Sequence, residues 1–366
     1  MSNFIYLDHA ATTPICEVAK DAIKNHMDDF GNPSSSNELG RKSRVLIENA
    51  REKIAMCINA KPEEIYFTSG GSEANSWVVS NYITLSSNFE HHSINAHYDG
   101  VCIDKNGFVD TQFFSYIPHP NAGYFELESC MYVNNEIGTI QPIKNIANIA
   151  HSKHMLFHTD AVQAVGHIPI DVRDLNCDML SASAHKFGGP KGVGFLYIKN
   201  GTALKPLING GKQERGLRGG TENILGIVSM AAALEDAVEH MDERNAHIEY
   251  LRNKLLDLLL QIPGSHVNGS LKNRVCSNIN IRFDGVSGSR LVALCSLYDV
   301  HISSGSACNE GISAPSHVLK AIGLTDEEAL SSIRITLGYT NTEKEIEQAA
   351  KIITELVVQI RNDQTT

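Results

Sequence analysis

A lysine beside a serine, a histidine and several glycines is the most reactive-looking feature of the sequence. Residues 183–194 read SAHKFGGPKGVG and follow the apolar run 178–183, which is typical of a strand. A lysine on a rigid turn is a plausible Schiff-base residue, and Ser183 and His185 could each donate a hydrogen bond to a phosphate. Because an isolated lysine is more often a solvated surface residue, Lys186 becomes a candidate only together with the segments described next.

A glycine-rich turn earlier in the chain is a candidate phosphate site. Residues 69–75 read SGGSEAN, follow the predicted strand 64–68 and open a predicted helix. Gly70 and Gly71 allow a tight turn, and the first amides of the helix then present the positive end of its dipole to a ligand. Ser72 could add a hydrogen bond or cap the helix. The pattern is neither the dinucleotide motif GxGxxG nor the ATP motif GxxxxGK[ST], and an ordinary strand–turn–helix junction is the alternative.

An aspartate stands directly after another predicted strand. Residues 158–163 read HTDAVQ and follow the run MLF, so Asp160 lies at a carboxyl strand end, where open α/β sheets bind ligands. A buried carboxylate there needs a cationic partner, and the protonated pyridine nitrogen of pyridoxal phosphate would be one. The alternative is an aspartate that only caps a helix.

One of the eight cysteines differs from the others in its surroundings. Cys308 ends the Ser/Gly-rich segment SSGSAC (303–308), and an exposed loop of this kind suits a nucleophile that must travel. The alternative is a buried free thiol, which is our interpretation of the other seven. No CxxC pair is present, so we expect free thiols in a reducing compartment.

A metal site is not expected. His151, His154 and His158 lie close together in the sequence, but no cysteine or carboxylate completes a ligand set at a fitting spacing, and His158 begins a different element.

Composition limits the classes of function. The chain has 366 residues, 42% of them hydrophobic, and a formal net charge of −11. A chain of this size can bury a large core, and its acidic balance argues against non-specific binding to nucleic acid or to an anionic membrane. No run approaches the roughly 18 apolar residues of a membrane span, and residues 1–8 do not resemble a secretory signal, so we expect a cytoplasmic protein.

Short apolar runs alternate with amphipathic stretches along the first part of the chain. This order predicts an α/β fold, with a mostly parallel sheet covered by helices on both faces. Helices are predicted at 43–58, 72–85 and 143–154, and strands at 64–68, 131–134, 155–158, 178–181 and 193–198.

The order of elements changes in the last third of the chain. A long helical region, 222–261, is expected to contain a kink and to end before the Pro263-Gly264 breaker. Strands at 276–283 and 333–337 and helices at 289–298 and 342–360 then predict a smaller α+β domain.

Ten segments, in order and nearly from end to end, resemble the cysteine desulfurases of the NifS/IscS type, a group of class V aminotransferase-like, fold-type I pyridoxal-phosphate enzymes. The segments are YLDHAATTP (6–14), FGNPSS (30–35), FTSGGSEAN (67–75), EHHS (90–93), NNEIGTIQP (134–142), HTDAVQAVG (158–166), SAHKFGGPKGVG (183–194), RGGTEN (218–223), SSGSAC (303–308) and IRITLG (333–338). The resemblance implies conversion of L-cysteine to L-alanine, with the sulfur held as a persulfide on Cys308.

The resemblance also implies roles for individual residues. Lys186 binds pyridoxal 5'-phosphate covalently and later moves protons, and His91 stacks on the pyridine ring and acts as an acid or base. The remaining cofactor-binding residues would be Gly71, Ser72, Asn135, Asp160, Gln163, Ser183, His185 and, from a second subunit, Thr221. Asn32, Asn135 and Arg334 would bind the substrate, and a bidentate grip on its carboxylate would suit Arg334.

The same resemblance implies the organisation of the molecule and its partners. Residues 16–262 would form the large cofactor domain and 263–366 the small domain with the cysteine loop, while residues 1–15 would pack on the small domain. We expect a homodimer that binds L-cysteine and passes sulfur to an acceptor protein, by default an iron–sulfur scaffold. Thiolation of tRNA and DNA phosphorothioation would use the same site, and we expect no direct contact with nucleic acid or membrane.

Some positions depart from the family pattern. Asn37 and Phe89 replace a histidine and a threonine of the family's motifs, Ser72 stands where threonine is usual, and 118–126 is unfamiliar. Three functions stay open: a cysteine desulfurase, another enzyme of the same fold such as a selenocysteine lyase, and a catalytically idle sulfur-relay subunit. The presence of both Lys186 and Cys308 favours the first.

Overall fold

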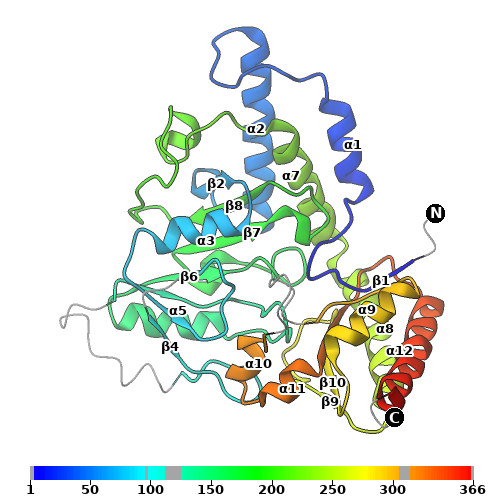
Figure 1. Cartoon of the computed structure of the whole chain (residues 1–366). Helices are drawn as coiled ribbons and strands as arrows, with labels where there is room; N and C mark the ends of the chain where they lie inside the picture. The colour runs from blue at the N-terminus through cyan, green and yellow to red at the C-terminus, as the bar shows by residue number, and fades with distance from the viewer. Residues whose placement is uncertain (1–3, 95–97, 112–124, 305–313, 364–366) are drawn as a thin grey trace.

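The computed structural model describes residues 4–94, 98–111, 125–304 and 314–363. A seven-stranded sheet forms its centre, with helices around it (Figure 1). In spatial order the strands are β2 (Ile65–Thr68), β8 (Gly194–Ile198), β7 (Met179–Ser183), β6 (Leu156–Asp160), β5 (Leu127–Ser129), β3 (Thr84–Ser87) and β4 (Tyr98–Val101). β8 runs antiparallel to both neighbours and every other pair is parallel, which confirms the predicted α/β fold with a mostly parallel sheet.

Helices cover the sheet and bury its apolar strands. α1 (Glu17–His26), α2 (Glu38–Cys57) and α7 (Ile224–Glu239) pack against one another, α3 (Gly71–Val79) packs on β7 and β8, and α5 (Ile143–Ser152) packs on β5 and β6. The short α6 (Val172–Leu175) contacts α5. Strands such as β7 and β8 are buried at every residue, as expected for strands covered on both faces.

A second apolar core lies beside the sheet. β10 (Asn278–Phe283) pairs antiparallel with β9 (Ser265–Val267) and β12 (Ser332–Thr336). α8 (Met241–Leu259), α9 (Gly288–Leu297) and α12 (Glu343–Asp363) contribute to this core, and the short α10 (His317–Ala321) and α11 (Asp326–Leu330) precede β12. In Figure 1 these elements, yellow to red, lie together below and to one side of the large sheet.

The first residues of the described chain pack against the second core. β1 (Ile5–Tyr6) pairs parallel with β11 (Val300–His301), and Leu7 is fully buried in the second core. This pairing supports the proposal that residues 1–15 pack on the small domain. Because α8 contributes to the second core, we propose that the division falls between α7 and α8 rather than after residue 262.

Several predicted elements differ from the structure. The helix predicted at 72–85 ends at Val79, because the Ser80 and Asn81 side chains donate to the Trp77 carbonyl and compete with further helical bonds. The strand predicted at 131–134 is wrong, and β5 lies at Leu127–Ser129 instead. The kink predicted within 222–261 is confirmed, since α7 and α8 break at His240.

A buried ion pair ties α2 to the sheet edge and to the loop before α7. Arg51, 3% exposed, donates from both terminal nitrogens to Glu214 at 2.8 Å and also to the Ile65 carbonyl at 2.7 Å. Glu214 accepts in addition from the Phe67 amide at 2.9 Å. Each charge therefore has its partner inside the protein, and loss of one partner would leave the other buried and unpaired.

We predict that Arg51→Ala lowers the free energy of unfolding by about 3–5 kcal/mol, because it leaves the Glu214 carboxylate buried without its cationic partner. The control is Lys53→Ala on the same helix, whose ion pair with Glu235 is about half exposed on both sides. That change should cost less than about 1 kcal/mol. Urea unfolding of the two variants measures the difference, and equal midpoints would show that the buried pair contributes nothing particular.

Candidate active site

A cavity of about 800 Å³ opens at the carboxyl ends of β6 and β7, between the large sheet and β12. Its walls come from segments far apart in the sequence, from Ala10 to Arg334. The predicted site residues that line it are Gly71, Ser72, His91, Asn135, Asp160, Gln163, Ser183, His185, Lys186 and Arg334. The structure thus brings ten predicted residues from six of the ten resembling segments to one place.

Lys186 lies at the end of the short 3₁₀ helix that follows β7. Its Nζ donates to the carbonyl oxygens of Ala10 and Ala11, at 2.7 and 2.8 Å. Gln163 donates to the same Ala10 oxygen at 2.9 Å. Gly188, with φ of +89°, makes the tight turn after the lysine that a residue with a side chain would adopt only with strain. The amine is therefore fixed at the cavity wall by the N-terminal segment.

The glycine-rich turn has the shape expected of an anion cradle. α3 begins at Gly71, where an added Cβ would lie 2.5 Å from Val162 Cγ2, so only glycine fits. Ser183 faces this turn from β7, with its Oγ 3.4 Å from where a Gly70 Cβ would be. The first amides of α3 and the serine hydroxyls can together bind a phosphate.

His185 lies beside this turn and is neutral. Its Nδ1 lies 3.1 Å from Thr12 Oγ1. Burial, helped by the positive charges of Lys186 and Lys191, lowers the pKa of His185 to about 4. A neutral imidazole still offers one N–H to a phosphate, so the residue can hold an anion as a hydrogen-bond donor without adding charge.

Asp160 is a buried carboxylate held by neutral donors. Val162 donates its amide to Oδ1 at 2.9 Å, and Asn75 donates to Oδ2 at 2.7 Å. Within the described parts of the chain, no cationic side chain lies within ion-pair distance of Asp160. A buried carboxylate that lacks a protein cation fits the protonated nitrogen of a pyridine ring.

The sequence analysis missed Asn75, the last residue of the segment SGGSEAN. Asn75 is 1% exposed, and its amide group donates to both Asp160 and Ser93 Oγ, the second at 2.9 Å. Ser93 Oγ lies 2.7 Å from His91 Nδ1, which also accepts from the Ser93 amide at 3.1 Å. Asn75 thereby connects Asp160, the predicted partner of the ring nitrogen, to His91, the predicted ring-stacking histidine. Its position one helical turn after the glycines, on the inward face of α3, was the available signal.

His91 is uncharged in this arrangement. Burial lowers its pKa, although the nearby Asp160 carboxylate acts in the opposite direction. Because Nδ1 accepts from a backbone amide, its proton resides on Nε2. The ring is therefore fixed in one tautomer.

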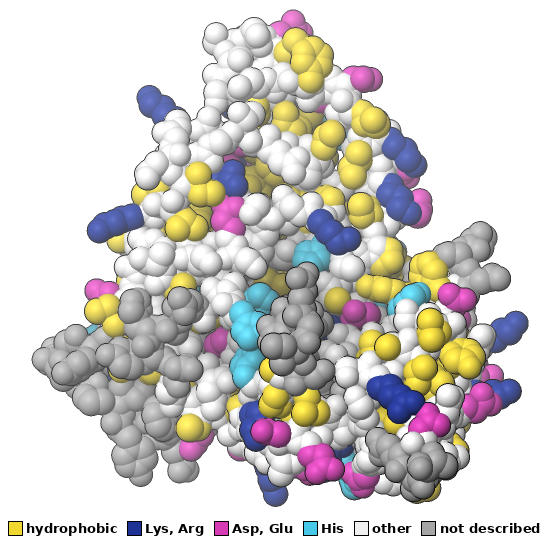
Figure 2. All heavy atoms as spheres, in the orientation of Figure 1, with side chains coloured by type: hydrophobic (Ala, Val, Ile, Leu, Met, Phe, Trp, Pro, Cys, Tyr) yellow, Lys and Arg dark blue, Asp and Glu magenta, His cyan; other side chains and the backbone are white. Residues whose placement is uncertain are grey.

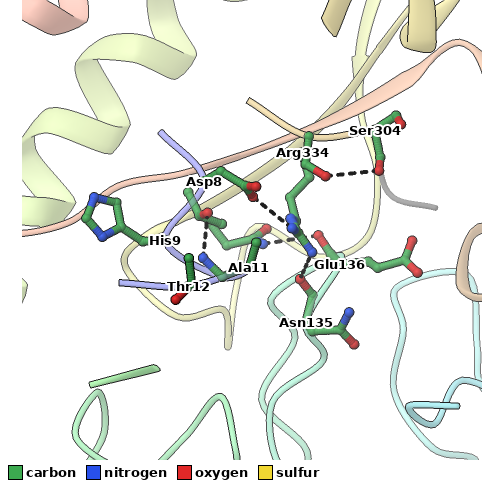
Figure 3. Close-up of polar contacts among 12 residues, drawn as sticks. Asp8, His9, Ala11, Thr12, Asn135, Glu136, Ser304 and Arg334 are labelled. Carbon is green, nitrogen blue, oxygen red and sulfur yellow. Dashed lines mark hydrogen bonds and ion pairs between the residues drawn. The ribbon is translucent and has the colours of Figure 1, made fainter. Parts of the chain in front are cut away.

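Arg334 supplies the positive charge of the cavity from β12. It is 4% exposed and donates to Asp8 Oδ1 at 2.8 Å and to the Asn135 carbonyl at 3.1 Å (Figure 3). Its Nε is buried without a hydrogen-bond partner among the described residues. The guanidinium thus keeps donors for a further acceptor, and a carboxylate is the acceptor that matches its geometry.

Three predicted site residues are not found at this cavity. Asn32 is exposed, and its side chain accepts from the Ser34 amide, so this chain does not bring it to the predicted substrate site. Thr221 is exposed and borders a separate small hollow together with Ser69 and Gly192. Cys308 lies outside the described residues.

The chain belongs to a known family. Residues 5–349 match the model described as aminotransferase class-V. Within this class it belongs with the cysteine desulfurases of the NifS/IscS type, as the sequence predicted. Two curated relatives named cysteine desulfurase IscS, from Methanosarcina thermophila and Clostridium botulinum, are each 40% identical to it. The aligned regions cover 98% of this chain and 93% of the first relative, and 99% and 96% for the second.

Solved structures show the same relationship. A NifS-like protein superposes with a TM-score of 0.90 at 34% identity, covering 97% of this chain and 100% of that one. A NifS-like protein from Rickettsia africae gives 0.88 at 32% identity, covering 98% and 100%. A structure of SspA in complex with cysteine gives 0.79 at 33% identity, covering 92% and 100%. The fold is therefore that of the class V family, whose members depend on pyridoxal phosphate.

No helix in the described ranges is both long enough and apolar enough to cross a membrane.

We predict that Asn75→Ala weakens cofactor retention and lowers the free energy of unfolding by about 1.5–3 kcal/mol, because a hydrogen bond to a buried carboxylate is lost. Ser76→Ala, at the next position of α3, changes a side chain that points elsewhere and should cost under about 0.5 kcal/mol. Thermal unfolding and the visible absorption of the bound cofactor measure both effects. Equal behaviour of the two variants would remove Asn75 from the site.

Proposed function

We propose that this chain is a pyridoxal-phosphate-dependent enzyme that converts L-cysteine to L-alanine and transfers the sulfur atom to Cys308 as a persulfide. The observation that carries the proposal is the convergence of Lys186, Asp160 and Arg334 on one cavity. The amine could react with the aldehyde of the cofactor, and the buried carboxylate could pair with its ring nitrogen. The buried guanidinium could bind the carboxylate of an amino acid.

The residues that would hold the cofactor lie around the carboxyl ends of β6 and β7. Lys186 would bind it covalently, Asp160 would pair with its ring nitrogen and Gln163 would bond its ring hydroxyl. Gly71, Ser72, Ser183 and His185 would surround its phosphate, and Asn135 would complete the pocket. When bound, pyridoxal phosphate supplies an electron sink that stabilises negative charge on the α-carbon of the amino acid.

The substrate would be oriented by its carboxylate. Arg334 lines this cavity, its Nη1 and Nη2 each make one hydrogen bond and keep a second N–H, and Asn135 lies directly beneath its guanidinium (Figure 3). A bidentate pair between guanidinium and carboxylate fixes both position and direction. Held in this way, the substrate would present its amino group to Lys186, whose Nζ is fixed by two carbonyl oxygens.

Proton transfer would fall to Lys186 and His91. The amine of Lys186 can carry a proton between the α-carbon and the cavity. His91, neutral because burial lowers its pKa, can accept a proton and return it, and its Ser93 contact keeps the ring in place.

The sulfur-accepting thiol must be nucleophilic, which most cysteines of this chain are not. Burial raises the pKa of the thiols of Cys16, Cys57, Cys130, Cys177, Cys276 and Cys295. A thiol with a raised pKa is a poor source of thiolate. Cys102 is exposed but does not line the cavity, so Cys308, whose segment resembles the family's cysteine loop, is the candidate that we propose.

Sulfur transfer to Cys308 would exchange one bond of the substrate sulfur for another. The Cys308 thiolate would form a bond to the substrate sulfur while the carbon–sulfur bond breaks. The electron pair of that bond would stay on the substrate carbon, which then takes a proton and leaves as alanine. No external oxidant is needed, because the sulfur is oxidised while the carbon is reduced.

A homodimer would complete the site. Thr221 is predicted to reach the phosphate of a second subunit, and its exposure beside Ser69 in this chain is compatible with that role. Exposed apolar side chains lie on α1, α2 and the turn between them, and Figure 2 shows hydrophobic side chains over this upper part of the surface, a composition suited to a subunit interface. They are Val18, Met27, Phe30, Leu39, Val45 and Met56.

The persulfide would be passed to an acceptor protein in the cytoplasm. An iron–sulfur scaffold is our default acceptor, because curated relatives that are 40% identical to this chain carry the name IscS. Thiolation of tRNA or a DNA phosphorothioation pathway would draw on the same persulfide.

We predict that the purified protein releases alanine and sulfide in equal amounts from L-cysteine and a reductant. Cys308→Ser should lower sulfide release to below about 1% of wild type while the cofactor stays bound, because the acceptor atom is gone. Lys186→Ala should abolish both turnover and the visible absorption of the bound cofactor.

The matched control for Cys308→Ser is Cys102→Ser, which changes an exposed free cysteine away from the cavity. This variant should turn over at the wild-type rate. Sulfide release at the wild-type rate by Cys308→Ser would exclude the persulfide role, and a yellow protein that makes neither product would exclude L-cysteine as the substrate.

A further prediction concerns Arg334. Arg334→Ala should raise the KM for L-cysteine by at least about 30-fold, since loss of one partner of a buried charged pair costs about 2–5 kcal/mol. Arg334→Lys keeps the charge but loses the fork and should recover only part of the affinity. Arg282→Ala on the neighbouring strand removes an ion pair to Glu328 outside the cavity and serves as control. An unchanged KM in Arg334→Ala would place the substrate carboxylate elsewhere.

A further inference from the structure

The proposed reaction assigns no role to Glu136, a buried acid in the cavity wall. Glu136 is 4% exposed and lines the same cavity as Arg334. Ser316, the N-cap residue of α10, donates its hydroxyl to Glu136 Oε2 at 2.5 Å. The Ser316 hydroxyl also accepts from the Leu319 amide at 3.2 Å, which holds the hydroxyl in place beside the carboxyl.

The backbone of Glu136 is held as firmly as its side chain. Its amide donates to Asn134 Oδ1 at 2.9 Å, and its carbonyl accepts from Asn278 at 3.0 Å and Asn280 at 3.1 Å. Figure 3 shows its side chain leaving the same turn as Asn135, whose carbonyl binds Arg334. The acid therefore has a fixed place next to the predicted carboxylate site.

The charges around this site leave it close to neutral before any substrate enters. Arg334 contributes one positive charge, and its ion pair with Asp8 offsets that charge. An incoming carboxylate is thus attracted by a guanidinium that is already paired. Under these conditions a second negative charge on Glu136 would decide whether the site attracts or repels the carboxylate.

We propose that Glu136 controls the affinity of the cavity for carboxylates: its neutral form permits binding at Arg334, and its ionised form opposes it. The assignment of the substrate carboxylate to Arg334 rests on the proposed function. The control by Glu136 concerns any small carboxylate in this cavity, whether or not a reaction follows.

The titration of Glu136 falls where this control would be felt. Burial raises its pKa to about 7, and the Ser316 hydrogen bond and the Arg334 charge limit the rise. Below that pKa the carboxyl is protonated and neutral, and above it the negative charge appears. Carboxylate affinity should therefore be high on the acid side and fall as the pH rises through about 7.

Glu90 also lines the cavity, and burial raises its pKa to about 8, so the Glu136→Gln variant is needed to separate the titration of Glu136 from that of Glu90. Arg334 from β12 is the described charge that acts on it, and Asp8 acts through its ion pair with Arg334. Ser316, Asn278 and Asn280 are neutral side chains. Among the cavity histidines, burial lowers the pKa of His91 and of His317, so both stay neutral on the alkaline side.

Propionate is a suitable probe, because it has a carboxylate but neither an amino group nor a thiol that would titrate. Binding to the holoenzyme would be followed by the visible absorption of the cofactor between about pH 6 and about pH 8.5. We expect the wild-type dissociation constant to rise about tenfold across this range. Glu136→Gln, which keeps the shape and loses the charge, should bind as tightly throughout as wild type does at low pH.

Ser316→Ala is the second variant and gives a signature that a structural role would not produce. Loss of the hydroxyl donor removes a bond that favours the ionised carboxyl, so the pKa of Glu136 should rise further. The fall in propionate affinity should then occur at higher pH than in wild type. This variant also keeps the proposal testable if Glu136→Gln folds poorly.

Proton uptake gives a readout that is independent of turnover. If propionate favours the protonated acid, binding near pH 7 must take up a fraction of a proton, by linkage. Wild type should take up this fraction and Glu136→Gln should not. Equal pH dependence and equal uptake in the two proteins would overturn the control by Glu136, even if cysteine is turned over. Failure of wild type to release alanine and sulfide would refute the proposed function and leave this result standing.

Discussion

Hydrogen bonds to the backbone of residues 8–12 hold Lys186 and connect the large sheet to β12. The carbonyls of Ala10 and Ala11 accept from Lys186, and Ala10 also accepts from Gln163. The Ala10 amide donates to Thr336 on β12 at 2.9 Å, two residues from Arg334. Because this segment follows β1, which pairs with β11, its position is fixed by the small domain while its polar groups face the large one. The site therefore depends on a strand of two residues at the start of the chain, and the relative placement of lysine and arginine follows from it.

Fixed charges are few in this cavity, and each has a distinct environment. Asp160 is surrounded by neutral donors, whereas Arg334 is paired with Asp8. His91 and His185 at the wall are neutral, since burial lowers the pKa of both side chains. The Asp160 carboxylate is thus available to a cationic ring, and the Arg334 guanidinium is available to an anion. A bound cofactor and a bound amino acid would each lie next to the opposite charge. Electrostatic preorganisation of this kind requires the folded scaffold, because none of these groups would hold its charge state or direction in water.

Much of this site could be predicted from the sequence, because strand ends and glycine turns have local signatures. The placement of Asp160 after β6 and of Lys186 after β7 followed from apolar runs that end in polar residues. Local patterns failed where tertiary contacts decide the structure: β5 contains the buried Glu128, whose charge disguised the strand. Asn75 was missed for a similar reason, since its role depends on Asp160 and Ser93, which are distant in sequence. The placement of Thr221 and Asn32 cannot be judged from one subunit, because neither residue lines the cavity of its own chain.

Glu128 and Glu90 extend the argument about buried acids beyond Glu136. Glu128 is fully buried, and burial raises its pKa well above the usual value, with the nearby Glu90 acting in the same direction. Burial raises the pKa of Glu90 to about 8, although Ser87 and the Met131 amide donate to it. Acids that stay protonated near neutral pH act as neutral polar groups, so Glu90 can line the cavity without repelling an anionic substrate, while Glu128 lies buried in β5. Glu136 differs from them in one respect that matters for function: it lies beside Arg334, so its ionisation is the one that a bound carboxylate would oppose most directly.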